Sequence, residues 1–230
     1  MKSLATILCV TLGLAGSVQA QATTSKGCSL ALAFALDVSS SVDEAEHQLQ
    51  RAGLASALQD PDVRSAILSR PAPVTLAAYE WSGEWRQSLL TGWHRIESEA
   101  DLTTFAANVL EPDRGETGFP TAIGAAVGYG AILLQEVPGC ERLVLDVSGD
   151  GANNDGYPPK IAYRHFPIAG VTINGLVIET PGSDVVEYYI NEVIRGPGAF
   201  VEVAHGFEDY ERAMKLKLLR ELQSQQFASR

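Results

Sequence analysis

The chain has 230 residues, of which 46% are hydrophobic and 20% are charged, and its formal net charge at pH 7 is −11. A chain of this length can bury a sizeable core, and its near-average apolar share excludes a disordered protein. The excess of acidic residues repels phosphate groups, so we expect neither nucleic acid nor an anionic lipid surface as a partner.

The first residues have the features of a secretory signal peptide. Lys2 gives a positive start, residues 4–18 are apolar, and Val18-Gln19-Ala20 forms a small-x-small cleavage motif. A transmembrane anchor needs about 20 apolar residues, and no other segment is long and apolar enough to span a membrane. We expect a secreted or periplasmic protein with a signal peptide at 1–20, a short segment at 21–28, one domain at 29–222 and a tail at 223–230.

The rest of the chain alternates between strands and helices. The continuous apolar run Leu30–Leu36 is typical of a central strand that is buried on both faces. In chain order we expect a strand at 30–36, a helix at 43–58, a strand at 74–81, a Ser82-Gly83 turn into a short strand near 85–90, a helix at 101–110 capped by Asp101, a Gly- and Ala-rich helix at 121–135, a strand at 142–147, a helix at 159–166, a strand at 171–178, a helix at 184–194, a strand at 200–204 and an amphipathic helix at 207–222.

This alternation favours an α/β fold with a mostly parallel, doubly wound sheet and helices on both faces. In such open sheets, ligands bind at the carboxyl ends of the strands. The residues at these ends are therefore the candidates for a site. Asp37, Ser39 and Ser41 follow the first strand, Asp150, Asn153 and Asn154 follow the strand at 142–147, and Thr121 opens the helix between them.

These side chains offer only oxygen. Such a donor set suits a hard divalent ion, Mg²⁺ or Mn²⁺ with Ca²⁺ as a further candidate, and suits zinc or copper poorly. The side chains of Asp37, Ser39 and Ser41 alternate, so an extended segment can turn all three to one side. Because hydroxyl ligands are neutral, the ion keeps positive charge toward solvent and can accept a carboxylate from a protein partner.

Simpler explanations of the same residues remain open. Asp37 and the two serines are also typical of a helix N-terminus. The loop at 149–156 has the composition of an ordinary Asn/Gly turn. Thr117 competes with Thr121 as the threonine of the site. Asp146 lies inside an apolar strand, where a carboxylate needs hydrogen bonds or a counter-charge, and the sequence does not identify its partner.

Three segments together resemble the von Willebrand factor A (vWA) domain. They are Asp37-x-Ser39-x-Ser41, Thr121 in a Thr-Ala-Ile-Gly setting, and Asp150-Gly151 after a buried strand. In that family the three segments form the metal-ion-dependent adhesion site, and here they occur in the same order. With its leader and its Asp-Val-Ser-Gly-Asp-Gly-Ala-Asn-Asn-Asp-Gly segment, the chain also resembles a bacterial group of secreted A-like proteins of unknown function. The resemblance covers about residues 29–204.

The resemblance implies roles for these residues and a specific fold. Ser39, Ser41 and Thr121 would supply hydroxyl ligands, and Asp37 and Asp150 would act directly or through water. The implied fold is a six-stranded Rossmann-like sheet with one short antiparallel edge strand, in which the first and fourth strands are neighbours.

Cys28 and Cys140 are the two cysteines that remain once Cys9 leaves with the signal peptide. Each precedes an apolar run, so if these runs are neighbouring parallel strands, both sulfurs lie at the same end of the sheet. We predict a disulfide, with two buried thiols as the alternative. The strand order that the resemblance implies supports the disulfide.

The leading functional hypothesis is a non-enzymatic binding module that uses a divalent metal to engage an acidic group on a protein partner. A metal-dependent hydrolase using Asp37 or Asp150, and a structural domain with a vacant site, are the alternatives. Trp81, Ser82, Asn153 and Asn154 are candidates for the rim of the ligand site. Trp85 is expected to be a partly buried anchor, and Lys217 to lie on a solvated helix face.

Overall fold

The computed structural model describes residues 27–111, 115–137, 139–180 and 182–223. The predicted signal peptide and all but the first residue of the predicted tail lie outside these ranges. The elements, in order, are β1 (Leu30–Asp37), α1 (Glu44–Gln59), α2 (Pro61–Leu68), β2 (Val74–Trp81), β3 (Gln87–Ile96), α3 (Glu99–Leu110), α4 (Ile123–Leu134), β4 (Leu143–Gly149), α5 (Pro159–His165), β5 (Val171–Ile178), α6 (Val185–Tyr188), a π-helical turn (Tyr189–Val193), β6 (Val201–Ala204), a 3₁₀ turn (Phe207–Asp209) and α7 (Tyr210–Gln223).

The six strands form one sheet in the order β3-β2-β1-β4-β5-β6. Every neighbouring pair is parallel except β2 and β3, which are antiparallel. The predicted α/β fold with an antiparallel edge strand is confirmed. That edge strand is longer than expected, because β3 continues to Ile96. Because an edge strand is partly exposed, the side chains of β3 show little alternation between polar and apolar residues. The sequence pattern therefore did not indicate the full length of this strand.

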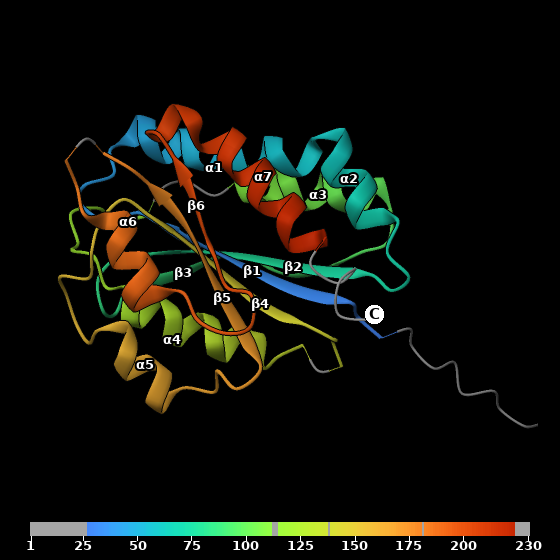
Figure 1. The fold of residues 1–230 in the computed structure, drawn as a ribbon. Helices are drawn as coiled ribbons and strands as arrows, with labels where there is room; N and C mark the ends of the chain where they lie inside the picture. Colours follow the sequence, from blue (N-terminus) through green and yellow to red (C-terminus); the bar gives the residue numbers. More distant parts are fainter. Residues whose placement is uncertain (1–26, 112–114, 138, 181, 224–230) are drawn as a thin grey trace, which may run out of the picture.

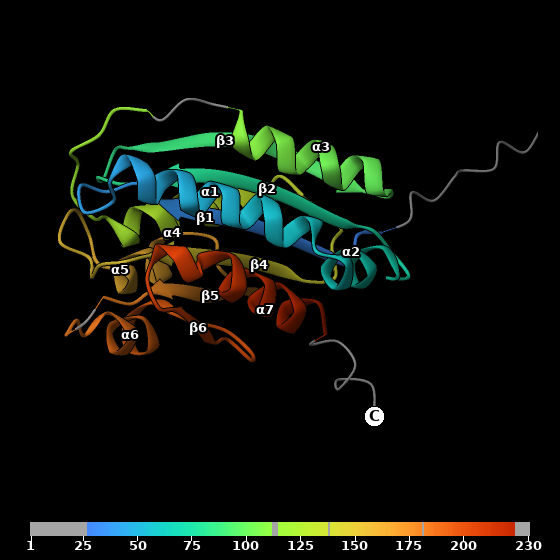
Figure 2. The same ribbon diagram turned by 90° about the horizontal axis from the view of Figure 1, so that it is seen from above.

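Helices cover both faces of the sheet (Figures 1 and 2). α1, α2, α3 and α7 lie on one face, and α4, α5 and α6 lie on the other. The sequence of β1 fits these two layers, because its large residues point to the α7 side and its alanines to the α4 side. Leu30, Leu32, Phe34 and Leu36 belong to the first core, and Ala31, Ala33 and Ala35 to the second.

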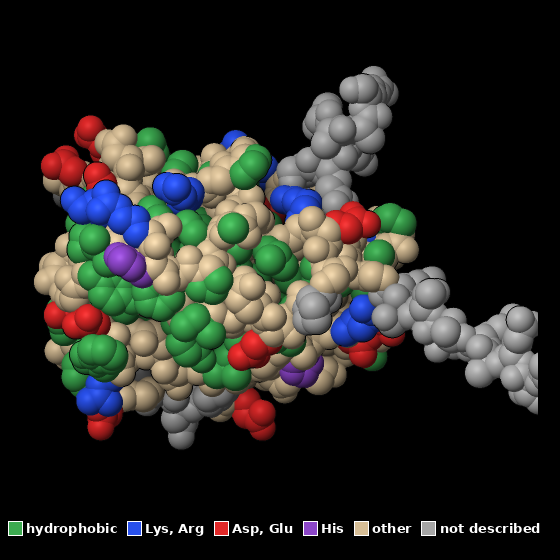
Figure 3. Space-filling model, turned by 90° about the horizontal axis from the view of Figure 1, so that it is seen from below, with side chains coloured by type: hydrophobic (Ala, Val, Ile, Leu, Met, Phe, Trp, Pro, Cys, Tyr) green, Lys and Arg blue, Asp and Glu red, His purple; other side chains and the backbone are tan. Residues whose placement is uncertain are grey.

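The small residues of α4 let this helix approach its neighbours closely. A methyl group added at Gly124 would collide with the carbonyl group of Tyr157, and one at Gly130 would come within 2.6 Å of Leu145 and of the Tyr79 hydroxyl. The expected close packing of this Gly- and Ala-rich helix is therefore present. Figure 3 shows this face of the molecule, where uncharged side chains cover most of the centre.

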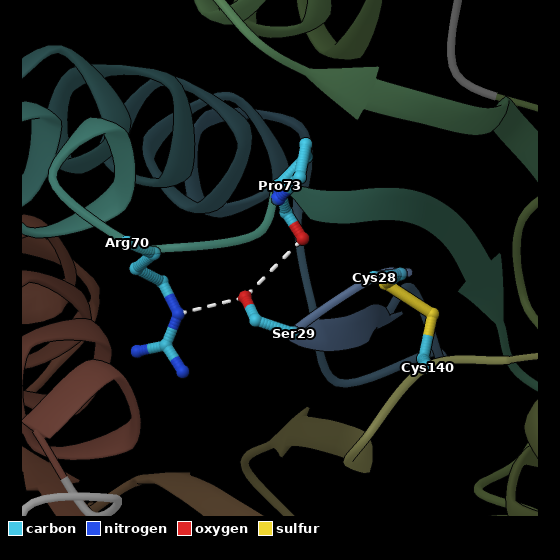
Figure 4. The surroundings of a disulfide bond; sticks show 5 residues. All are labelled: Cys28, Ser29, Arg70, Pro73 and Cys140. Atoms are coloured by element: carbon cyan, nitrogen blue, oxygen red, sulfur yellow. Dashed lines mark hydrogen bonds between the residues drawn. A yellow bond between two sulfur atoms is a disulfide. The ribbon is translucent and has the colours of Figure 1, made fainter. Parts of the chain in front are cut away.

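Cys28 and Cys140 form the predicted disulfide (Figure 4). It joins the residues just before β1 and β4, at the amino end of two neighbouring strands. Beside it, the Ser29 hydroxyl donates a hydrogen bond to the Pro73 carbonyl over 3.2 Å and accepts one from Arg70 over 2.9 Å. The amino ends of β1, β2 and β4 are thus tied together at the edge opposite to the carboxyl ends.

Two helix starts differ from the expectation. Between the predicted helix at 43–58 and the strand at 74–81 lies an additional helix, α2, which Asp60 caps and in whose first turn Pro61 stands, where a missing N–H costs nothing. The cap of α3 is Ser98, and Asp101 is the third helical residue of a capping box rather than the cap.

Lys217 is fully buried, so its expected place on a solvated helix face is wrong. Its ammonium group lies 2.8 Å from Asp146 and 2.6 Å from Glu221. Lys217 is thus the counter-charge that the sequence did not identify for Asp146. Asn174 adds a hydrogen bond to Glu221 over 2.7 Å. This buried polar network attaches α7 to β4 and β5.

None of the helices within the described ranges is long and apolar enough to cross a bilayer.

Candidate metal centre

The candidate site lies where the sheet changes its direction of winding. β1 and β4 are neighbours in the middle of the sheet, but the chain runs from β1 toward β2 and from β4 toward β5. The connections that leave the carboxyl ends of β1 and β4 therefore run in opposite directions. The crevice between such connections is where open α/β sheets bind ligands. Asp37 is the last residue of β1, and Asp150 follows the last residue of β4.

Asp37 is fully buried and held in a fixed orientation. Its Oδ1 accepts a hydrogen bond from the backbone N–H of Ser39 over 2.8 Å. Its own carbonyl oxygen accepts one from the Gln50 side chain of α1 over 2.9 Å. Its Oδ2 has no hydrogen-bond partner among the described residues. One oxygen of this carboxylate is therefore available for a further ligand.

The two serines connect Asp37 to Asp150. Ser39 Oγ lies 3.2 Å from Ser41 Oγ, and Ser41 Oγ donates a hydrogen bond to Asp150 Oδ1 over 2.8 Å. Ser39 is buried and Ser41 is exposed, so the row of oxygens runs from the interior to the surface. The loops after β1 and β4 thus bring four of the five predicted ligands together.

Thr121 approaches the same place from the loop before α4. Its backbone N–H donates to Asn154 Oδ1 over 2.8 Å, and its carbonyl oxygen accepts from the Asn154 N–H over 2.9 Å. A methyl group on Gly151 would lie 3.7 Å from Thr121 Oγ1, so this hydroxyl lies beside the residue that follows Asp150. Thr117, the competing threonine, is exposed in the preceding loop.

The electrostatics of the two carboxylates favour a cation. Burial raises the pKa of Asp37 to about 7, and the neighbouring charge of Asp150 adds to this shift. Burial also raises the pKa of Asp150. Two carboxylates that are both costly to ionise gain most from a bound positive charge, which offsets both the desolvation and their mutual repulsion.

The donor set fits a hard divalent ion. The five side chains offer carboxylate and hydroxyl oxygens only, and one buried carboxylate oxygen has no partner among the described residues. No group of three or more His, Cys, Asp or Glu side chains with the geometry of a metal site occurs in the described part of the chain. The candidate ligands are thus two carboxylates and three hydroxyls.

Asn153 and Asn154 hold the loop after β4 against the start of α4. Asn153 Oδ1 accepts a hydrogen bond from the Gly124 N–H over 3.0 Å, and its amide donates to the Asp155 carbonyl over 2.9 Å. No side chain of its own caps α4. Asn153 thus serves as a cap from a distant loop, a role that the sequence did not reveal. The Asn154 side chain contacts the Thr121 backbone, and a place for the two asparagines at the ligand rim stays a prediction.

The prediction that Trp81 belongs to the ligand rim is wrong. Trp81 is paired with Asp37 in the sheet and is fully buried, because the α4 layer covers this side of β2. Ser82 is also buried, but it lines a cavity of about 250 Å³ together with Glu80, Trp85 and Arg86. Trp85, expected to be partly buried, is 86% exposed. The β2–β3 turn thus presents Trp85, and not Trp81, to solvent.

One family of proteins matches most of the sequence. A family model described as "Protein of unknown function (DUF1194)" matches residues 27–226. None of the curated proteins matches the sequence.

Several solved structures resemble this one. Proximal thread matrix protein 1 from the mussel byssus, in a structure with a zinc-occupied MIDAS motif, is 14% identical, with 84% of this chain and 48% of that chain covered and a TM-score of 0.60. The von Willebrand factor type A structure from Catenulispora acidiphila is 13% identical, with 85% and 43% covered and a TM-score of 0.59. The PilB minor pilin from Streptococcus sanguinis is 14% identical, with 89% and 64% covered and a TM-score of 0.62.

The chain spans about half the length of the mussel protein and less than two thirds of the other two. At these identities the likeness shows the fold alone. It confirms the predicted vWA fold, with its mostly parallel sheet, independently of the metal-site motif.

Proposed function

The chain belongs to the DUF1194 family of proteins of unknown function, and we propose that it is a binding module that holds one divalent cation and engages an acidic group of a protein partner. Ser39, Ser41 and Thr121 supply the hydroxyl ligands. Asp37 and Asp150 supply negative charge, directly or through water. The bound cation supplies a Lewis-acidic centre with a position open to a partner's carboxylate.

The observation that carries this proposal is the convergence of the loops after β1 and β4. The hydrogen bond between Ser41 and Asp150 spans 109 positions of the sequence. The alternative of a helix cap at Asp37 is wrong, because Asp43 caps α1. A shared cation explains why carboxylates and hydroxyls from both loops meet. Thr121, beside Gly151, gives the third element of the same site.

The identity of the cation follows from the donor chemistry. Oxygen donors favour Mg²⁺ or Mn²⁺, and Ca²⁺ is a further candidate. The mussel protein binds zinc at its MIDAS motif, so zinc belongs in the same panel of metals. Neutral hydroxyl ligands leave net positive charge at the ion, and this charge attracts a carboxylate.

The site is proposed to act outside the cytoplasm. A disulfide at the amino ends of β1 and β4 favours an oxidising compartment. The predicted signal peptide agrees with this, and so does the likeness of the fold to a minor pilin, PilB. We therefore propose a secreted or periplasmic location for the mature protein, and binding rather than catalysis as its activity.

The experiment compares capture of proteins from an envelope extract by wild type, Asp150→Ala and Asp62→Ala. The last variant removes an exposed carboxylate of α2 that pairs with Lys215 of α7. We expect partners that are retained in Mg²⁺ by wild type and Asp62→Ala, and lost in EDTA or with Asp150→Ala. Binding that survives both treatments contradicts the proposal. Metal-dependent turnover of generic ester or phosphoester substrates that Asp37→Ala abolishes would favour the hydrolase instead.

A further inference from the structure

Tyr189 lies beneath the candidate metal centre and takes no part in the ligand set described above. It is the first residue of the π-helical turn that follows α6, and it is fully buried. The Ile194 N–H donates to its carbonyl oxygen over 3.0 Å, which closes the wide turn. Such π-turns are often found at functional sites. The Tyr189 hydroxyl has no hydrogen-bond partner among the described residues.

Two glycines make room for this side chain. A methyl group on Gly175 of β5 would come within 2.7 Å of the Tyr189 ring, and one on Gly149 of β4 within 2.5 Å of its hydroxyl oxygen. The ring therefore crosses β5 at one glycine, and the hydroxyl reaches the end of β4 at the other. Glycine inside a buried strand often marks such a close approach.

Two other buried side chains with an unpartnered polar atom approach the same glycine. The same methyl group would lie 2.9 Å from Asp37 Oδ2 and 3.4 Å from the Trp81 ring. Asp37 Oδ2 and Trp81 Nε1 also have no hydrogen-bond partner among the described residues. Buried polar groups are rarely left unpaired, because desolvation without a hydrogen bond is costly. Three such groups around one glycine indicate a shared partner.

We propose that Tyr189 is a positioning residue of the metal centre, whose hydroxyl holds Asp37 Oδ2 through one buried water that Trp81 Nε1 also binds. This inference rests on the proposed function, because it assigns a residue that orients one of the proposed ligands. Tyr189 does not itself touch the cation.

The hydrogen-bonding capacities of the groups match this arrangement. The Trp81 indole can only donate, an ionised Asp37 oxygen can only accept, and the Tyr189 hydroxyl and a water can do both. One water would thus have three polar partners, the usual number for a buried water. Burial raises the pKa of Tyr189 well above its usual value, so the hydroxyl keeps the proton it donates.

This arrangement fixes both oxygens of Asp37. The Ser39 N–H holds Oδ1, and the Tyr189 hydroxyl holds one lone pair of Oδ2 through the water, so the second lone pair of Oδ2 stays available to the cation. A carboxylate held at both oxygens cannot rotate away from its neighbours in the site. Residues that orient metal ligands in this way commonly contribute about 10- to 100-fold to metal affinity.

The test is Mn²⁺ titration of wild type, Tyr189→Phe and Tyr79→Phe by calorimetry. Tyr79→Phe is the matched control, because Tyr79 is also fully buried on the α4 side of the sheet, but its hydroxyl donates to the Ala126 carbonyl over 2.7 Å. We expect Tyr189→Phe to weaken Mn²⁺ binding about 10-fold or more and Tyr79→Phe to leave it within about twofold of wild type. The loss of one hydroxyl keeps the ring in place, and circular dichroism checks the fold.

Equal Mn²⁺ affinity for wild type and Tyr189→Phe overturns the inference but not the proposed function. An equal loss in both variants overturns it as well, since the effect would then be general destabilisation. Absence of binding of Mn²⁺, Mg²⁺, Ca²⁺ and Zn²⁺ alike by wild type overturns the proposed function and the inference together. A crystal structure of the wild type gives a second readout, in which a Tyr189 hydroxyl bonded to a group unrelated to Asp37 contradicts the assignment.

Discussion

The Ser41 hydroxyl donates a hydrogen bond to Asp150 Oδ1 over 2.8 Å, although the two residues are 109 positions apart. This contact exists because β1 and β4 are parallel neighbours, so the loops that leave their carboxyl ends meet. The same strand order places Cys28 beside Cys140 at the opposite edge. The pairing of β1 with β4 therefore explains both the candidate metal centre and the disulfide.

The buried ion pair of α7 should be essential for stability. Lys217→Met leaves Asp146 and Glu221 buried without their common counter-charge, and we expect a loss of about 3–5 kcal/mol in the free energy of unfolding. Urea denaturation measures this loss.

Lys215→Met is the matched control on the same helix. Lys215 is partly exposed and pairs with Asp60 and Asp62, so its loss should cost far less than the loss of Lys217. Similar losses for the two variants would show that the buried network does not secure α7.

Asp146 should make stability depend on pH. Burial raises the pKa of Asp146 from 3.8 to about 7, with Glu221 adding to the shift and Lys217 opposing it. Between about pH 4 and 7 the folded state therefore keeps a proton that the unfolded state has lost. The resulting stabilisation is complete below the unfolded pKa and is lost as the pH rises to about 7.

Asp146→Asn removes this titration. In EDTA, we expect the unfolding free energy of the variant to fall less steeply between pH 5 and 8 than that of wild type. The buried Asp37 has a raised pKa in both proteins, so part of the slope remains. Parallel pH profiles for the variant and wild type would contradict this account of Asp146.

The disulfide should stabilise the fold without affecting the metal centre. Replacing Cys28 and Cys140 by serine removes a cross-link between residues 112 positions apart, with an expected loss of about 2–4 kcal/mol in unfolding free energy. Because the bridge lies at the amino ends of the strands, Mn²⁺ affinity of the folded variant should not change. A weakened metal affinity would indicate coupling between the two edges of the sheet.

Gly149 and Gly151 should respond differently to alanine. A methyl group at Gly149 meets the Tyr189 hydroxyl at 2.5 Å and Asp37 Oδ2 at 2.9 Å, so Gly149→Ala should cost about 1–3 kcal/mol. The nearest atom to a methyl group at Gly151 is 3.7 Å away, an ordinary contact, and Gly151→Ala should leave the unfolding free energy within about 1 kcal/mol of wild type. Equal costs in urea denaturation would contradict the crowding at Gly149.

Much of the fold was predictable from local patterns. Apolar runs, continuous in β1 and interrupted by Asp146 in β4, located these two strands, and the polar residues directly after them located Asp37 and Asp150. Their adjacency in the sheet came from the resemblance to the vWA domain, because a hydrophobic run does not reveal its neighbour.

Other features depend on tertiary contacts that the sequence does not show. Lys217 looked like a surface residue, because its helix carries many charges, yet its partners come from β4 and from the next turn of α7. Trp81 and Trp85 lie four residues apart, and only the layer of helices decides that the first is buried and the second exposed. No pattern in the sequence pointed to Tyr189 as a residue near the site. The glycines Gly149 and Gly175, inside two strands, are the sequence feature that corresponds to the space its side chain fills.

Mn²⁺ titration of the folded protein by calorimetry, with Asp37→Ala, Asp150→Ala and Asp62→Ala beside wild type, tests the central claim most directly. The account predicts one cation per chain for wild type and Asp62→Ala, and no detectable binding for the two variants of the site. A wild-type protein that binds no Mn²⁺, Mg²⁺, Ca²⁺ or Zn²⁺, or site variants that bind as tightly as wild type, would contradict it.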